Sequence, residues 1–136
     1  MRCLGIDFGL KRVGLALSDP TGTLVSPYRT IERTTRDALF DELAEILQKE
    51  SVATIVIGLP LSLDGQDTLT TRQVRNFAAS LERRTDLPIH LMDERLSSAL
   101  AEEELNAAGL RGPKRKAALD SQAAAVILRS WLENGH

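Results

Sequence analysis

Asp120 carries the strongest chemical signal in this sequence, because it is an acid on the apolar side of a predicted helix. The residues at +3, +4, +7 and +11 from it are Ala123, Ala124, Ile127 and Trp131, and they share its helix face. A carboxylate that points toward a core is costly unless it is paired, protonated or bound to a metal ion. Asp120 therefore needs a partner, unless it lies at a frayed helix start and turns outward.

Asp7 is the expected neighbour of Asp120. Residues 2–8 alternate in size, and Asp7 lies on the small-residue face of that predicted strand. The helix that carries Asp120 is rich in alanine and can approach such a face closely, which would bring two carboxylates together. Repulsion between them would raise one pKa, whereas bridging divalent cations would let both stay ionised. A plain surface-turn aspartate is the alternative for Asp7.

A second acidic site follows the apolar segment 89–92. Asp93 and Glu94 come directly after it, at the strand end where ligand crevices form in α/β sheets. Acids at this position can also cap the next helix and complement its dipole. The spacing favours that structural role for Asp93 and leaves Glu94 evenly balanced between a structural and a chemical role.

Basic residues gather just before the helix of Asp120. Residues 111–116 carry four positive charges. Since the net charge of the whole chain is −2, the remaining residues sum to −6. This loop, which holds Lys114, Arg115 and Lys116, could grip phosphates, and Lys11 and Arg12 could extend the patch. A solvated loop between helices is the alternative. Few aromatic residues are present, which disfavours recognition of single strands by base stacking.

The elements that position these residues follow from hydrophobic periodicity. Alternation predicts strands over 2–8 and 13–18, joined by a short connection at 9–12, and a third strand over 23–28. Helical spacing and buried β-branched segments then predict, in order, a helix over 36–50, a strand over 54–58, a helix through 74–81, a strand over 89–92, and helices over 97–108 and about 116–133. The order predicts an α/β fold with a mixed five-stranded sheet, a three-strand antiparallel meander plus two parallel strands, flanked by helices.

Composition places the chain among globular proteins. It has 136 residues, 43% hydrophobic and 26% charged, which suits one domain over 1–136 and excludes disordered and fibrous classes. The near-balanced charge excludes a uniformly basic nucleic-acid coat. No apolar run approaches the ~20 residues of a membrane span, so we expect a cytoplasmic protein that binds no membrane.

Several other site classes are poorly supported. The one cysteine, Cys3, lies in an apolar run and cannot form an internal disulfide. His90 and His136 have no companion ligands at zinc spacing. The glycines form neither a phosphate loop nor a dinucleotide fingerprint, so no nucleotide cofactor is expected.

Taken together, the motifs resemble one family along nearly the whole chain. They are Gly5-Ile6-Asp7-Phe8-Gly9, Lys11-Arg12-Val13-Gly14, Ser18-Asp19-Pro20, Val56-Ile57-Gly58-Leu59-Pro60 with Asp64-Gly65, Asp93-Glu94-Arg95-Leu96-Ser97-Ser98, Lys114-Arg115-Lys116 and Asp120-Ser121-Gln122-Ala123-Ala124. In this order they resemble the YqgF family, also called RuvX, the Holliday-junction-resolvase-like proteins and pre-16S rRNA nucleases. One departure is Ser97-Ser98, where the family often has threonine; the hydroxyl groups are kept.

The resemblance implies an RNase H-like fold and a metal-dependent nuclease. Carried over by motif, the catalytic and metal-binding acids are Asp7, Glu94 and Asp120, with Asp64 as a second-tier candidate. The resemblance points to maturation of ribosomal RNA during ribosome biogenesis, and junction resolution is the older proposal.

On this basis we expect phosphodiester hydrolysis by two Mg²⁺ or Mn²⁺ ions. Arg95, Lys11, Arg12 and the cluster Lys114 to Lys116 would position the backbone of the nucleic acid, with RNA favoured over structured DNA. A non-catalytic nucleic-acid-binding module is one rival. A sugar-kinase or actin-like ATPase is another, because Asp7-Phe8-Gly9 before a hairpin resembles its first phosphate loop, but one lobe is all that this length can build.

Overall fold

The computed structural model describes residues 1–94, 97–109 and 112–134, apart from the side chains of residues 97–99, 112–114, 116 and 117. The elements in chain order are β1 (Arg2–Phe8), β2 (Arg12–Ser18), β3 (Val25–Glu32), α1 (Arg36–Lys49), β4 (Val52–Leu59), α2 (Leu69–Glu82), β5 (Ile89–Asp93), α3 (Ser97–Ala107) and α4 (Gly112–Glu133). This is the element order that the periodicity predicts.

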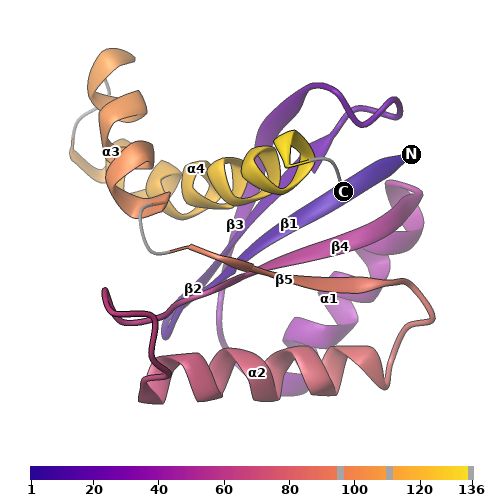
Figure 1. Ribbon diagram of the computed structural model, residues 1–136. Helices are drawn as coiled ribbons and strands as arrows, with labels where there is room; N and C mark the ends of the chain where they lie inside the picture. The colour runs from indigo at the N-terminus through magenta and orange to yellow at the C-terminus, as the bar shows by residue number, and fades with distance from the viewer. Residues whose placement is uncertain (95–96, 110–111, 135–136) are drawn as a thin grey trace.

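The five strands form one mixed sheet in the order β3-β2-β1-β4-β5 (Figure 1). β1, β2 and β3 make an antiparallel meander, while β4 pairs in parallel with both β1 and β5. The predicted α/β class and mixed sheet are confirmed. Because β1, β4 and β5 run in the same direction, their carboxyl ends meet at one edge of the sheet.

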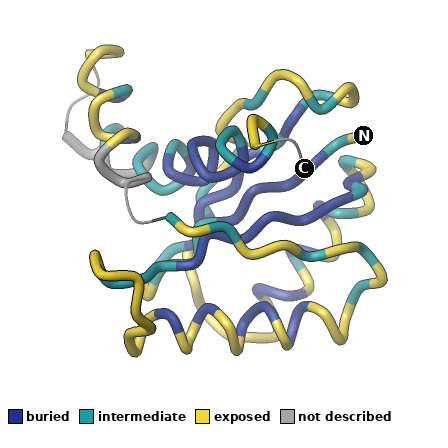
Figure 2. Tube along the Cα trace, in the orientation of Figure 1, coloured by how far each residue is buried: buried dark blue, intermediate teal, exposed yellow. Residues whose placement is uncertain are grey.

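The face of the sheet that carries the large side chains of β1 is covered by α1 and α2 (Figure 1). Leu4 and Ile6 of β1 pack there with Phe40 of α1 and Phe77 of α2. All four side chains are buried, and Figure 2 shows β1, β2 and β4 mainly dark blue, whereas β3 and β5 are mostly intermediate or exposed. The alternation in β1 thus decides which face receives the main core.

The small-residue face of the sheet is covered by α4. Cys3 and Val56 contact Ile127 and Leu128 of this helix, and Ala16 packs against its alanines. Small residues on both sides let helix and sheet approach closely, as predicted. α3 does not cover the sheet but packs on α4, through Ala101.

Threonine caps fix the starts of α1 and α2 at the sheet edge where the parallel strands end. The Thr35 side chain accepts a hydrogen bond from the Ala38 amide, 3.1 Å away. Thr68 and Thr71 form a reciprocal capping box at α2, and the buried Thr71 hydroxyl also donates to the Pro60 carbonyl. These bonds satisfy amides that have no partner inside the helix.

The predicted bounds of the third strand and of the last helix are wrong, and the strand predicted over 54–58 is longer, Val52–Leu59. The third strand runs over Val25–Glu32 rather than 23–28, because the Asp19 carboxylate accepts from the amides of Thr23 and Leu24 and holds them in the turn. At its other end, Ile31 pairs with Val13 and is buried, so the strand continues.

The last helix, in turn, begins at Gly112 rather than near 116. Pro113 is compatible with this earlier start, because a first-turn amide has no helical partner to lose.

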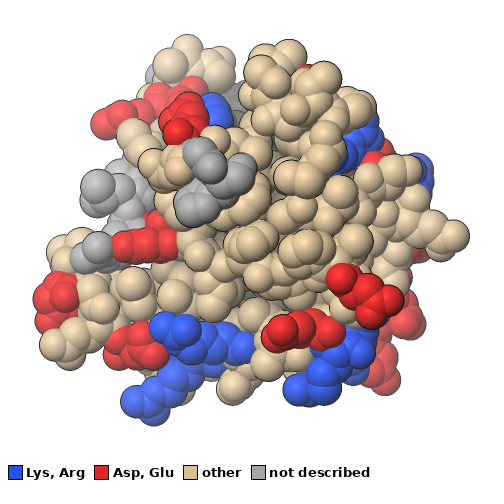
Figure 3. All heavy atoms as spheres, turned by 45° about the vertical axis from the view of Figure 1, so that its right-hand side comes forward, with Lys and Arg blue, Asp and Glu red and all other residues tan. Residues whose placement is uncertain are grey.

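Charged side chains of both signs are mixed on the surface. Figure 3 shows Lys and Arg interspersed with Asp and Glu along the lower part of one face, with an uncharged area above them. Among the residues that the structure describes, no helix is long and apolar enough to cross a membrane.

Candidate active site

Three acidic residues from distant parts of the chain converge at the carboxyl edge of the parallel strands. Asp7 lies at the end of β1, Glu94 directly follows β5, and Asp120 lies in α4. The Glu94 amide donates to the Leu59 carbonyl, 3.2 Å away, which fixes the chain as it leaves β5 beside β4. The carboxyl groups of Glu94 and Asp120 both act on Asp7, the first by a hydrogen bond and the second by its charge.

Gly58 lets Glu94 reach Asp7, although β4 lies between their strands. A Cβ atom on Gly58 would lie 2.7 Å from Oε2 of Glu94 and 2.4 Å from Cδ1 of Ile127. Any larger residue at this position would therefore occupy the space that the Glu94 carboxyl group takes. The sequence analysis places Gly58 in a buried strand and in a family motif but assigns it no role at the site, which sequence reasoning therefore missed.

Gly14 lets α4 bring Asp120 down onto the sheet. Gly14 pairs directly with Asp7 across β1 and β2, on the same face. A Cβ atom on Gly14 would lie 2.0 Å from the carbonyl oxygen of Asp120. This close backbone contact brings Asp120 near Asp7, as the small-residue pattern predicts.

Burial is the main influence on Asp7. It raises the pKa of this carboxyl group to about 6, and the negative charge of Asp120 acts in the same direction. The hydrogen bond from the Glu94 carboxyl group opposes them, because it stabilises the ionised form of Asp7. The site therefore concentrates negative charge in a place that solvates it poorly.

Arg12 is the partner that Asp120 requires. Its Nε atom donates to Oδ2 of Asp120 at 2.6 Å, and both side chains are partly buried. The carboxylate raises the pKa of the Arg12 guanidinium in return. The positively charged side chain of Arg12 thus already lies beside the acids. The sequence analysis expected this side chain to contact a phosphate.

The other predicted basic contacts are only partly described. Lys11 is exposed in the turn before β2. Arg115 donates through Nη1 to Oδ1 of Asn106, 2.7 Å away, and so ties α4 to α3. Arg95 and the side chains of Lys114 and Lys116 lie outside the described residues.

The second-tier candidate Asp64 lies in an exposed turn between β4 and α2. The Ser62 hydroxyl donates to its carboxylate, and Ser62 and Gly65 are joined by a backbone hydrogen bond. The groups that shift the pKa of Asp7 are the Glu94 carboxyl group, through a hydrogen bond, and Asp120, through its charge. Asp64 is therefore placed in a structured turn rather than in the acidic cluster.

The acidic cluster suits a hard divalent cation by the chemistry of its donors. Carboxylate oxygens are the ligands that Mg²⁺ prefers, and a cation can replace both the hydrogen bond between Asp7 and Glu94 and the ion pair between Arg12 and Asp120. Within residues 1–94, 97–109 and 112–134, however, no three His, Cys, Asp or Glu side chains are already arranged to hold an ion.

Residues 1–134 match the RuvX family, described as Holliday junction resolvase. The chain belongs to the RuvX family. It is 70% identical over 132 residues to a protein of Maridesulfovibrio salexigens, covering 97% of this chain and 98% of that one, and 54% identical to one of Nitratidesulfovibrio vulgaris, covering 97% and 93%. Both relatives are named "Putative pre-16S rRNA nuclease".

Solved structures show that the RuvX chain has an RNase H-like fold. RuvC of Thermus thermophilus, in complex with a Holliday junction, aligns with a TM-score of 0.63 over 99% of this chain and 96% of that one, at 13% identity. The Holliday junction resolvase of fowlpox virus aligns with a TM-score of 0.58, over 98% and 99%, at 12% identity. The predicted family and fold are both confirmed.

Proposed function

We propose that this RuvX-family chain is a divalent-metal-dependent nuclease of the cytoplasm that acts as one domain over residues 1–136. Its proposed substrate is the precursor of 16S rRNA, as the name of its relatives indicates. The observation that carries the proposal is the convergence of Asp7, Glu94 and Asp120 at the carboxyl edge of an RNase H-like sheet.

The three acids are the proposed ligands of Mg²⁺ or Mn²⁺ in a two-metal site. When bound, the ions supply an activated water and stabilise the leaving oxygen of the phosphodiester. Asp7 is central, because its carboxyl group is hydrogen-bonded to Glu94 and its pKa is raised by the negative charge of Asp120. Its buried position makes its oxygens strong ligands, since water competes poorly there.

Arg12 has a second part in this proposal. It compensates the charge of Asp120 in the free protein, and its exposed fraction of 34% leaves it able to turn toward a phosphate. Lys11, Arg95, Lys114, Arg115 and Lys116 are the further residues proposed to hold the backbone of the nucleic acid. Such contacts set affinity and position but not sequence preference.

The runner-up function is resolution of DNA junctions. The description of the matching family favours it, since it reads Holliday junction resolvase. A resolvase makes paired cuts and would act as a two-fold dimer, whereas an RNA-processing nuclease can act as a monomer.

The test compares end-labelled single-stranded RNA, single-stranded DNA and a four-way DNA junction, each with Mn²⁺, Mg²⁺ or EDTA. Wild type is measured beside Asp7→Asn and beside Asp41→Asn, a control at an exposed position of α1. We expect RNA cleavage that requires both the metal ion and Asp7 and that persists in Asp41→Asn.

Other outcomes assign the protein differently. Symmetric cutting of the junction, with RNA left intact, would establish the resolvase. Binding of nucleic acid without cleavage under any ion would make the chain a nucleic-acid-binding module. Full metal-dependent cleavage by a folded Asp7→Asn protein would remove Asp7 from the site.

A further inference from the structure

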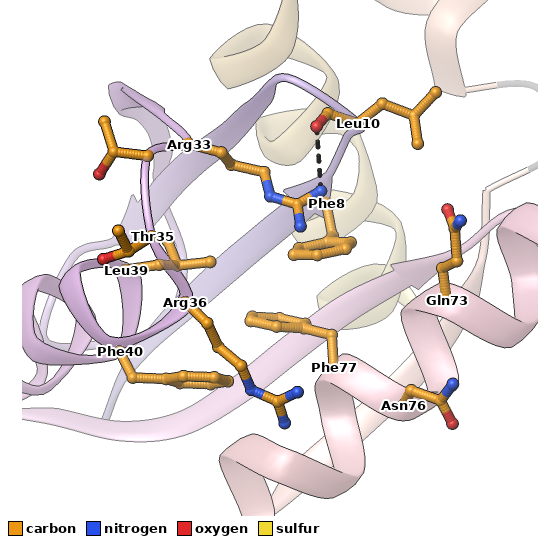
Figure 4. A pocket seen from close by; sticks show the side chains of 11 residues that line it. Phe8, Leu10, Arg33, Thr35, Arg36, Leu39, Phe40, Gln73, Asn76 and Phe77 are labelled. Atoms are coloured by element: carbon orange, nitrogen blue, oxygen red, sulfur yellow. Dashed lines mark hydrogen bonds between the residues drawn. The ribbon is translucent and has the colours of Figure 1, made fainter.

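A pocket lies on the opposite face of the sheet from α4, between the start of α1 and the middle of α2 (Figure 4). Its volume is about 440 Å³, within the ~300–1,000 Å³ typical of small-molecule sites. The lining side chains come from three places: the end of β1 and its turn, the start of α1 with the segment that enters it, and α2. None of the residues assigned to the acidic cluster lines it.

The pocket and the acidic cluster share one strand. Phe8 lines the pocket and directly follows Asp7, and consecutive residues of a strand point to opposite faces. Leu10, in the turn after β1, stands at the pocket rim with 71% of its surface exposed. A nucleic-acid strand with one phosphate at Asp7 would therefore pass within reach of the pocket around the end of β1.

Arg33 is held in place at the pocket wall. Its Nη1 atom donates to the carbonyl oxygens of Gly9 and Leu10, at 2.9 and 3.0 Å, and its guanidinium lies 4.4 Å above the Phe8 ring (Figure 4). The other face of Phe8 stacks on Phe77, with ring centroids 4.2 Å apart. Both faces of Phe8 are thus covered, and the fixed guanidinium is the planar surface that a ligand would meet.

The remaining polar groups of the pocket suit the edge of a base and a phosphate. Gln73 and Asn76 are exposed on one face of α2, and each amide can both donate and accept hydrogen bonds. Arg33 and Arg36 are the charged residues among the described lining, which includes no carboxylate. A ligand that is planar, has donors and acceptors on its edge and carries negative charge matches this set, and a nucleotide has all three properties.

We propose that this pocket binds a nucleotide of the substrate strand, turned out of its stack, next to the phosphate that is cut at Asp7. The inference rests on the proposed nuclease function and adds to it a site for one base. The base would stack on the Arg33 guanidinium, contact Leu10, and pair its edge with the amides of Gln73 and Asn76.

The test measures the affinity of an RNA strand in which a single nucleotide lacks its base, with that position moved along the strand. Binding is measured in Mg²⁺ on the Asp7→Asn protein, so that the strand is not cut. Gln73→Glu introduces a negative charge into the pocket, and Gln48→Glu makes the same change at an exposed position of α1 outside the pocket lining. Wild-type cleavage is measured separately.

We expect loss of one particular base to weaken binding about 10-fold, in line with the value of one stacked base. Gln73→Glu should weaken the intact strand by a similar factor and should then be insensitive to removal of that base, whereas Gln48→Glu behaves like wild type. Affinity that is equal for every position of the missing base, beside normal cleavage, would overturn the inference and leave the nuclease intact.

A second arm separates the two possible sources of a nucleotide. Free nucleoside monophosphates are titrated while the aromatic NMR signals of Phe8 and Phe77 are followed. Saturation below about 1 mM by free nucleotide, without any effect of base removal in the strand, would assign the pocket to a free ligand and overturn the strand proposal. This arm also reads out if the protein proves not to cut nucleic acid at all.

Discussion

Oε2 of Glu94 lies 2.7 Å from the position that a Cβ atom on Gly58 would take. β4 lies between β1, which carries Asp7, and β5, which Glu94 follows. It thus has no side chain at the place where Glu94 must cross it to reach Asp7. The acidic cluster depends on this missing side chain as much as on the three carboxyl groups.

Gly58→Ala should abolish metal-dependent cleavage by displacing Glu94. The new methyl group also meets Cδ1 of Ile127, 2.4 Å away, so a loss of about 1–3 kcal/mol in unfolding free energy is expected from overpacking. Urea unfolding and a cleavage assay measure the two effects. Adding Ile127→Val removes the Cδ1 atom, and the double variant should regain stability but not activity. Recovery of both would mean that Glu94 was not displaced.

Gly14→Ala should be more damaging to the fold than Gly58→Ala. Its methyl group would meet the backbone of α4, 2.0 Å from the carbonyl oxygen of Asp120, and a backbone cannot turn aside as a side chain can. We expect a loss of at least about 3 kcal/mol, at the upper end for overpacked sites, measured by urea unfolding. A Gly14→Ala protein as stable as wild type would show that α4 does not press on β2.

Without metal ions, Asp7 should make stability fall as pH rises. The pKa of Asp7 is about 6 in the folded protein and about 4 for an unfolded aspartate, so its contribution is complete below pH 4 and lost as pH rises through 6. Asp7→Asn should then be more stable than wild type at pH 7.5 in EDTA, by on the order of 2–3 kcal/mol, and nearly equal at pH 4. Urea unfolding at both pH values measures this, with Asp41→Asn as the control. Equal stability of Asp7→Asn and wild type at pH 7.5 would contradict the burial of an ionised Asp7.

Arg12→Gln should strengthen metal binding while weakening catalysis. Arg12 competes with a cation for Asp120, so its removal is expected to raise the affinity for Mn²⁺ in the absence of nucleic acid by about 10-fold, or about 1.4 kcal/mol. Cleavage should fall because a phosphate contact is lost. Calorimetric titration with Mn²⁺ in the absence of nucleic acid measures the change in metal affinity. Lys11→Gln, at the exposed neighbouring position, is the control for that affinity. Unchanged Mn²⁺ affinity in Arg12→Gln would show that the arginine does not occupy the cation's place.

Local periodicity was enough to predict much of the site. The alternation of β1 assigned Asp7 to the small face, and the helical spacing after Asp120 turned it toward the same face, so their proximity followed from sequence. The predicted faces of Asp7 and Asp120 are both correct, because shifting either pattern by one residue would bury polar groups. The element order and the sheet followed in the same way.

Features that depend on contacts between distant segments could not be predicted. Spacing alone could not choose between Asp93 and Glu94, since the choice depends on the empty space over Gly58. The partner of Asp120 was expected to be a metal ion or Asp7, but Arg12 reaches it across 108 positions of the chain. The pocket that Phe8 lines could not be predicted from the sequence, because its lining residues come from three separate elements.

The succession of Asp7 and Phe8 also restricts how β1 can change its length. One added or deleted residue earlier in this strand would exchange the two, placing the ring among the acids and the carboxylate in the aromatic stack. Such a change would damage core, cluster and pocket at once, whereas many single substitutions would damage only one of them. Relatives of this chain should therefore vary in residue type along β1 but not in the number of residues, with gaps confined to the turns at either end.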